Sequence, residues 1–148
     1  MTIYTIGFSK KNLREFIAKL QNAGVKKVID VRLNNTSQLA GYAKKEDLEY
    51  ILDLVGIGYE HHPELAPTEE LLKGYKQKKI PWDQYESEFN KILPKRQPLK
   101  SIDFENQNGS ICLLCSEDKP DRCHRRLLAE YYSRNLPGAG ARVEIKHL

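Results

Sequence analysis

The sequence is poor in sulfur-containing residues and in tryptophan. Its 148 residues include three cysteines, one methionine and one tryptophan. An odd number of cysteines at irregular spacing provides no framework of paired disulfides, which argues against a small disulfide-rich secreted fold. The sequence also lacks any run of about 18 apolar residues, the length that spans a bilayer. The first residues, MTIYTIGFSKK, lack the long apolar centre of a secretory signal. We therefore expect a cytoplasmic protein with no membrane partner.

The chain is only weakly basic. Lys and Arg total 24, Asp and Glu total 20, and the net charge is +4. This excess favours an anionic partner, either a small molecule or a nucleic acid, but the basic residues are scattered and form no block. A solvated surface explains the same balance. The length fits one domain that comprises residues 1–148.

Strand-like and helix-like patterns alternate along most of the chain. Sequence patterns predict strands at residues 3–6, 27–32, 111–115 and 142–148, and residues 56–60 lead into a further short strand. Helical spacing of apolar residues predicts helices from 13 to a stop at Gly24, and at 45–55, 69–78, 82–93 and 121–135. Residues 94–109 have little pattern, and 137–141 form a turn. We expect a single three-layer α/β domain, with a mainly parallel sheet of about five strands and helices on both faces.

Ligands of such sheets bind beyond the carboxyl ends of the strands. Gly7 ends the first predicted strand, where it allows a positive φ or a close backbone approach, and Ser9 adds a hydroxyl. Asp30 and Arg32 share one face at the end of the second strand. Arg32 is suited to a phosphate or carboxylate, and Asp30 to orienting His124 or holding Arg32; a buried structural ion pair is the alternative.

The loop after the second strand contains two further candidate ligand-binding residues. Ser37 offers a hydroxyl, and Tyr42 either stacks on a ring of the ligand or covers the end of the core.

The cysteines differ in their expected environments. Cys112 and Cys115 form a C-x-x-C pair, but residues three apart in a strand point to opposite faces, so we expect neither a zinc site nor a redox pair there. Cys112 is then a small core residue. Cys115 stands where the strand ends. Cys123 lies in the first turn of the next helix if Asp121 is the N-cap.

A helix N-terminus and the adjacent arginine favour a thiolate on Cys123. We therefore expect alkylation of Cys123 to be fastest, followed by Cys115 and then Cys112. Glu117 and His124 are candidate general acids or bases, and Arg125 a candidate anion ligand. A core role for His124 and an ordinary ion pair for Glu117 are the alternatives. The spacing of Cys115, Cys123 and His124 predicts no metal site, and nothing in the sequence calls for a cofactor.

These motifs together resemble the domain of unknown function 488 family. The segments that carry the resemblance are TIGFS, DVRLNNTS, GYAKKEDL, LLCSEDKPDRCHRR and a final V-x-x-x-H-L. The resemblance implies a compact α/β domain with its motif residues at one site, and it gives no reaction. The motif positions are Gly7, Ser9, Asp30, Arg32, Ser37, Cys115, Glu117, Cys123, His124 and Arg125. Asn35 and Ala66-Pro67 depart from the family pattern.

A weaker resemblance is to rhodanese-like sulfurtransferases, which also have D-V-R after an early strand and a catalytic cysteine in a strand–loop–helix turn. Cys115 is the candidate. The loop SEDKPDR has no glycine, and Pro120 removes a backbone donor, so the resemblance is incomplete. The function expected from the sequence is binding of an anionic ligand, plausibly nucleotide or nucleic acid, either as an enzyme or as a binding module without turnover.

Overall fold

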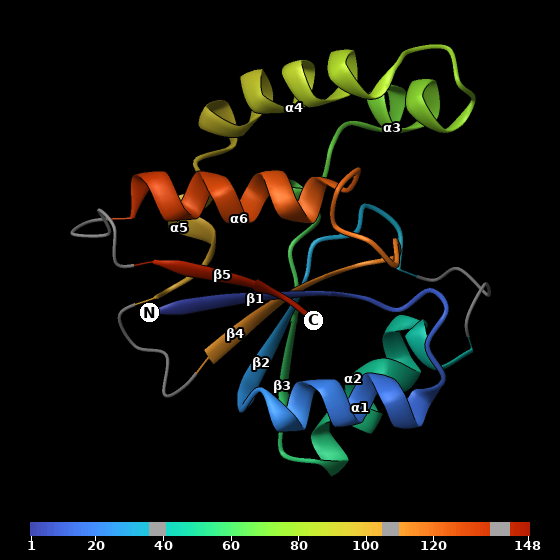
Figure 1. The fold of residues 1–148 in the computed structure, drawn as a ribbon, viewed down its shortest axis with the longest axis vertical. Coiled ribbons are helices and arrows are strands. Elements are labelled where there is room, and N and C mark those ends of the chain that lie inside the picture. Colours follow the sequence, from blue (N-terminus) through green and yellow to red (C-terminus); the bar gives the residue numbers. More distant parts are fainter. Residues whose placement is uncertain (36–40, 105–109, 137–142) are drawn as a thin grey trace.

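The computed structural model describes residues 1–35, 41–104, 110–136 and 143–148. All five strands of the sheet are parallel, in the order β3-β2-β4-β1-β5 (Figure 1). The strands are β1 (Thr2–Gly7), β2 (Val25–Asp30), β3 (Gly58–His61), β4 (Ser110–Cys115) and β5 (Glu144–His147). The α/β class predicted from the alternating patterns is confirmed, and the sheet is wholly parallel.

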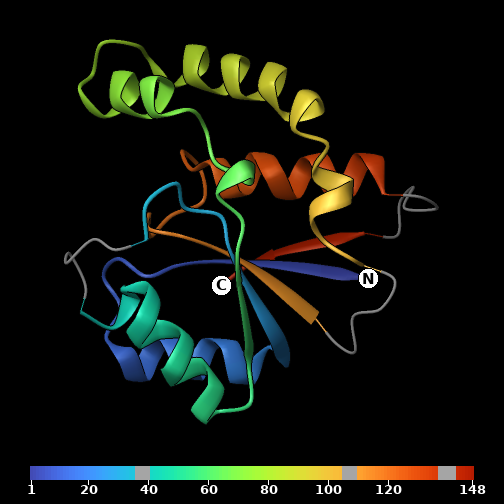
Figure 2. The same ribbon diagram turned by 180° about the vertical axis from the view of Figure 1, so that it is seen from behind.

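Helices cover both faces of the sheet, as expected for parallel strands joined by crossovers (Figures 1 and 2). One face carries α1 (Leu13–Asn22) and α2 (Lys45–Leu54). The other carries α6 (His124–Asn135), with α3 (Glu69–Lys76) and α4 (Trp82–Arg96) packed outside it. The short helices are η1 (Gly41–Ala43), η2 (Pro63–Leu65) and α5 (Pro98–Ser101).

Strand alternation divides the core into two layers. Ile29, Leu113 and Cys115 pack with α4 and α6, and this cluster includes Phe89 and Leu127. On the opposite face, Val28, Cys112 and Leu114 pack with α1 and α2. The prediction that Cys112 and Cys115 face opposite sides of the sheet is therefore confirmed.

The helix boundaries follow the predicted ones except that α4 runs three residues past its predicted end, α6 begins later than predicted, and α5 was not predicted. The side chain of Asn12 caps α1 by accepting from the backbone N–H of Glu15 at 2.8 Å, as the sequence indicated. The N-cap of α6 is Cys123, however, and the expected cap at Asp121 is wrong. A turn in which the N–H of Cys123 donates to the carbonyl of Pro120 at 3.1 Å occupies that stretch instead. Helix α5 lies in the segment that showed little pattern.

Two expectations fall on residues outside the described ones: the turn at 137–141 and the role of Ser37. Among the helices that the structure describes, none combines the length and the apolar character that crossing a membrane requires.

The end of β4 is the point where the chain changes sides. The strands β1 and β2 flank β4, and each leads to a helix on the α1–α2 face, whereas β4 leads to α6 on the other face (Figure 2). Chain segments therefore diverge beyond the carboxyl end of β4. Such a divergence opens a crevice, and ligands of open α/β sheets bind there.

Candidate functional site

A cavity of about 260 Å³ opens at the carboxyl end of β4. Cys115 is the last residue of that strand and is paired in the sheet with Gly7. The cavity is lined by the sheet edge, by the loop after β4 and by the α3–α4 hairpin, through Phe8, Arg32, Leu33, Asn34, Leu72, Tyr75, Lys76, Tyr85, Cys115, Ser116, Glu117, Arg122, Cys123 and His124. Five of the residues predicted for the site therefore meet in one cavity: Arg32, Cys115, Glu117, Cys123 and His124.

Cys115 lies beside the ring of His124. Its Sγ atom is 3.6 Å from Nδ1 and 3.9 Å from Nε2 of that ring. The Nε2–H group of His124 donates to the carbonyl oxygen of Val31 at 2.7 Å, which fixes the ring. Phe89 packs edge-on against the ring, with centroids 5.7 Å apart.

These contacts stabilise a thiolate on Cys115. A hydrogen bond from the Cys123 thiol and the positive charge of His124 hold the pKa of Cys115 well below the usual thiol value, although burial opposes the shift. Burial lowers the pKa of His124, but the neighbouring Cys115 sulfur outweighs it and the net shift is upward. The pair therefore favours a thiolate beside an imidazolium, the arrangement that activates cysteine nucleophiles.

Cys123 has the opposite character. Burial and the adjacent Cys115 sulfur raise the pKa of its thiol well above the usual value. As the N-cap of α6, Cys123 makes no capping hydrogen bond with its side chain. The helix terminus therefore does not produce the thiolate that the sequence suggested for Cys123, and the lowered pKa belongs to Cys115 instead. Burial raises the pKa of Cys112 as well, in agreement with its expected inert role.

The same three side chains are the candidate metal ligands among the described residues. The Sγ atoms of Cys115 and Cys123 and a ring nitrogen of His124 lie within 4.8 Å of one another, although their sequence spacing predicted no site. A metal ion binds a histidine nitrogen along its lone pair. The similar distances from the Cys115 sulfur to both ring nitrogens place that sulfur beside the ring rather than beyond either nitrogen. The hydrogen bond to Val31 uses Nε2 and leaves Nδ1 facing the two cysteines, so it fits either a metal ligand or an imidazolium. The position of the Cys115 sulfur beside the ring is what favours a thiolate–imidazolium pair over a metal.

Asp30 holds Arg32 and does not reach His124. The carboxylate of Asp30 accepts from Nε and Nη2 of Arg32 at 2.9 and 2.8 Å, and Asp30 is fully buried. Tyr59 donates to the same carboxylate at 2.5 Å. Nη2 of Arg32 also donates to the carbonyl of Ala43. Asp30 therefore positions Arg32 at the cavity wall, and the carbonyl of Val31 takes the orienting role toward His124.

Arg125 is a structural residue of the loop. Its fully buried guanidinium donates to Thr5 Oγ1 at 3.3 Å and to the carbonyls of Glu117 and Asp118. It does not line the cavity. A Cβ atom at position 7 would lie 1.5 Å from the carbonyl oxygen of Glu117. Only glycine leaves room for this carbonyl, so Gly7 allows the close backbone approach that the sequence suggested. Together, Arg125 and Gly7 fix the loop that follows Cys115.

Ser9 and Tyr42 lie next to the cavity and not on its wall. The backbone N–H of Ser9 donates to the carbonyl of Ser116 at 3.0 Å. The Tyr42 hydroxyl donates to the carbonyls of Phe8 and Lys11, and its ring packs on Phe16. Tyr42 therefore covers the core end, the alternative that the sequence left open.

Sequence reasoning missed the second wall of the site. Tyr75, Lys76 and Tyr85 come from the α3–α4 hairpin, and Arg122 lies at the mouth. An open cavity of about 900 Å³ adjoins the first through shared residues and adds Lys78, Lys79, Ile80, Pro81, Trp82 and Asp83. The only available signal was a lysine-rich segment, YKQKK, between two helical patterns.

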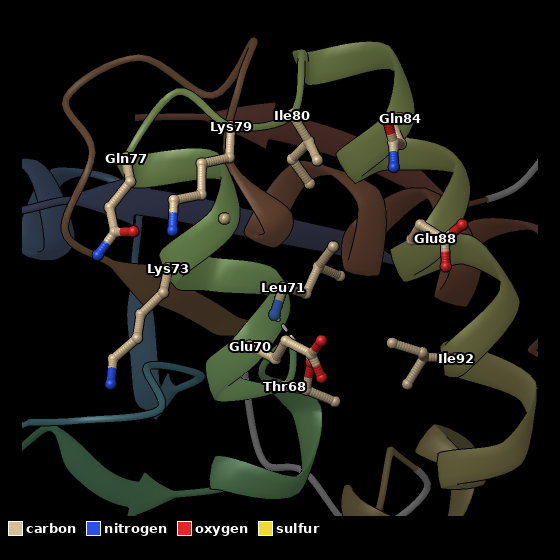
Figure 3. Close-up of a pocket in the computed structure, with 11 residues that line it drawn as sticks. Thr68, Glu70, Leu71, Lys73, Gln77, Lys79, Ile80, Gln84, Glu88 and Ile92 are labelled. Atoms are coloured by element: carbon tan, nitrogen blue, oxygen red, sulfur yellow. Dashed lines mark hydrogen bonds between the residues drawn. The ribbon is translucent and has the colours of Figure 1, made fainter.

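A further groove of about 590 Å³ lies between α3 and α4 (Figure 3) and shares Lys79 and Ile80 with the open cavity. Thr68 and Leu71 face Glu88 and Ile92 across it. Its lining contains no cysteine or histidine, so we place the functional site at the end of β4.

The comparison with family models decides the family of the chain. The model described as "Domain of unknown function DUF488" matches residues 12–132. This chain belongs to the DUF488 family. The resemblance inferred from the D-V-R and C-S-E…C-H-R motifs is therefore confirmed. Searches of curated proteins and of solved structures found no match.

Proposed function

We propose that this DUF488 protein is a thiol-dependent enzyme that acts on an anionic substrate of the nucleotide or nucleic-acid class. One observation carries the proposal. The Cys115 sulfur, whose pKa is lowered, stands on the wall of a cavity that also presents Arg32 and Arg122. A cysteine beside a histidine is a common arrangement of an activated thiol.

Each residue has a role in this proposal. Cys115 is the nucleophile, and His124 keeps it ionised. Arg32 and Arg122 hold the anionic group, with Arg32 positioned by Asp30. Glu117 is exposed at the mouth of the cavity and is the group placed to transfer a proton to or from the substrate.

The adjoining cavity favours the nucleotide class. It brings Lys76, Lys78, Lys79 and Arg122 together beside Trp82. Cationic side chains bind phosphates, and aromatic rings beside them stack on bases. Glu117 and Asp83 are carboxylates in the same lining, which argues against tight binding of duplex nucleic acid. A nucleotide or a short single strand fits this mixture of charges best.

The second candidate is a binding module without turnover. It is favoured by the burial of His124, whose Nε2–H is already bonded to Val31. A histidine held in this way does not exchange protons with a substrate, so proton transfer is left to the carboxylate of Glu117 at the mouth.

Protection of Cys115 and conversion of substrate separate the candidates. Iodoacetamide labelling of Cys115 is measured with AMP, ADP, a single-stranded oligonucleotide or inorganic phosphate present, and each nucleotide is then analysed by chromatography. The enzyme predicts both protection and a conversion that Cys115→Ser abolishes and Cys112→Ser retains. Protection without conversion supports the module. Absence of protection by all four anions rejects an anionic ligand.

A further inference from the structure

Cys115 and Cys123 are the two sulfurs of the candidate site, and they lie close together. Their Sγ atoms are within 4.8 Å, and both line the same cavity. Cys112 lies on the other face of the sheet, packed with the α1–α2 cluster. Of the three cysteines, Cys115 and Cys123 are therefore the pair whose sulfurs lie close together.

Bond formation between these sulfurs requires only local movement. Cys123 is the N-cap of α6, with extended backbone angles of φ −136° and ψ 138°, so it lies outside the regular helix. The segment between the two cysteines is a loop. Rotation about the side chains and a small shift of this loop bring the sulfurs from contact toward the S–S bond length of about 2.05 Å, with no strand or helix disrupted.

We propose that Cys115 and Cys123 form a redox-active dithiol, in which a hydroperoxide oxidises Cys115 and Cys123 resolves the product to a disulfide. The proposal rests on the thiolate of Cys115 and goes beyond the proposed function in assigning a role to Cys123. In the first step the Cys115 sulfur attacks one oxygen of the hydroperoxide. The O–O bond breaks, the alcohol leaves with a proton from solvent, and Cys115 becomes a sulfenic acid.

In the second step the Cys123 sulfur attacks the Cys115 sulfur. The S–O bond breaks, and the hydroxide leaves as water with the proton of Cys123. In total, two thiols and one hydroperoxide give one disulfide, one alcohol and one water. The sulfurs lose two electrons, and the peroxide gains two. A dithiol reductant restores the pair.

The electrostatics of the pair set the order of the steps. While Cys115 is a thiolate, its negative charge helps to raise the pKa of Cys123, which stays protonated and donates a hydrogen bond. Oxidation of Cys115 to a neutral sulfenic acid removes that charge. Burial still raises the pKa of Cys123, but the nearby guanidinium of Arg125, which favours the thiolate, is then no longer opposed by the charge of Cys115. Cys123 therefore becomes a better nucleophile when its target has formed.

The test uses the full-length protein and hydrogen peroxide. Trypsin cleaves after Arg122, so the disulfide joins the peptide 101–122 to the peptide 123–125. We expect the wild-type protein to lose two hydrogens in mass and to give this linked pair, and dithiothreitol to reverse both. Cys112→Ser is the matched control and keeps the linked pair, which also excludes Cys112 as the partner.

In Cys123→Ser we expect a sulfenic acid on Cys115 that dimedone traps. Formation of sulfenic or sulfinic acid on Cys115 of the wild-type protein, without the linked peptides, overturns the proposal. Labelling of Cys115 by iodoacetamide distinguishes the failures. If Cys115 is alkylated but forms no disulfide, the redox-active dithiol is rejected and the proposed function stands. If Cys115 reacts with neither iodoacetamide nor peroxide, the proposed function loses its basis as well.

Discussion

The Nε2 nitrogen of His124 lies 2.7 Å from the carbonyl oxygen of Val31. The helix α6 and the strand β2 come from distant parts of the chain, and this hydrogen bond joins them across the site. It assigns one proton of the imidazole to Nε2. A second proton, on Nδ1, makes the ring a cation beside Cys115.

The pH dependence of Cys115 reactivity tests this arrangement. The lowered pKa of Cys115 means that its thiolate is present at a pH where ordinary thiols are protonated. Iodoacetamide labelling, followed by mass spectrometry, should therefore reach half of its maximal rate well below pH 9.0, the usual thiol value. In His124→Gln the midpoint should rise, because the cation is absent. An unchanged midpoint in that variant would show that His124 does not stabilise the thiolate.

The ion pair of Asp30 and Arg32 is expected to contribute strongly to stability. Removing one partner of a buried pair leaves the other charge uncompensated, at a cost of about 3–5 kcal/mol. Urea denaturation of Asp30→Asn should show a loss of about 3 kcal/mol or more in the free energy of unfolding. Asp53→Asn is the control at an exposed aspartate of α2 and should change stability by less than about 0.5 kcal/mol. Equal effects of the two substitutions would contradict the buried pair.

The neighbouring arginines of α6 offer a matched pair of substitutions. Arg125 is fully buried, whereas the Arg126 side chain is 27% exposed and pairs with Glu86 at 3.4 Å. Lysine keeps the charge but cannot reproduce the guanidinium fork. We expect Arg125→Lys to lower the free energy of unfolding by about 2 kcal/mol or more, because buried carbonyls lose a charged donor. Arg126→Lys should cost less than about 1 kcal/mol. Calorimetry that ranks the two in reverse order would exclude the structural role of Arg125.

Metal content is a direct test of the thiolate–imidazolium pair. We expect protein purified without added metal to contain no stoichiometric zinc, because the Cys115 sulfur lies beside the His124 ring and not beyond either ring nitrogen. Titration with Co²⁺ should give no intense thiolate-to-metal absorption. Stoichiometric zinc, or a Co²⁺ spectrum that Cys123→Ser abolishes, would assign the three side chains to a metal site.

The sequence predicted the features of the site that depend on local periodicity. Alternation along a strand was enough to place Cys112 and Cys115 on opposite faces, and parallel strands brought Arg32 and Cys115 to one edge. The start of α6 was wrong because Asp121 is a good N-cap residue in any local scheme. A local turn from Pro120 to Cys123 occupies that stretch, Arg125 contacts a carbonyl of the preceding loop, and Cys123 is the cap.

The sequence could not predict which cysteine has the lowered pKa, because this also depends on tertiary packing. A helix N-terminus lowers the pKa of an accessible thiol, but the thiol of Cys123 is buried against another sulfur. Only the packing of α6 on β4 establishes which sulfur carries the charge. The lining supplied by Tyr75, Lys76 and Tyr85 likewise depends on how the α3–α4 hairpin folds over the sheet edge.

Residues from two different stretches of the chain form the site. The reactive sulfur and its partners come from β4, α6 and the ends of β1 and β2, whereas Tyr75, Lys76 and Tyr85 come from a helical excursion between β3 and β4. Phe89 of α4 packs against the His124 ring, but Tyr75 and Lys76 of α3 make no contact of this kind with the Cys115–His124 pair. A lineage of such proteins is therefore free to exchange one ligand for another by altering the lining residues of α3 while it retains the same chemistry.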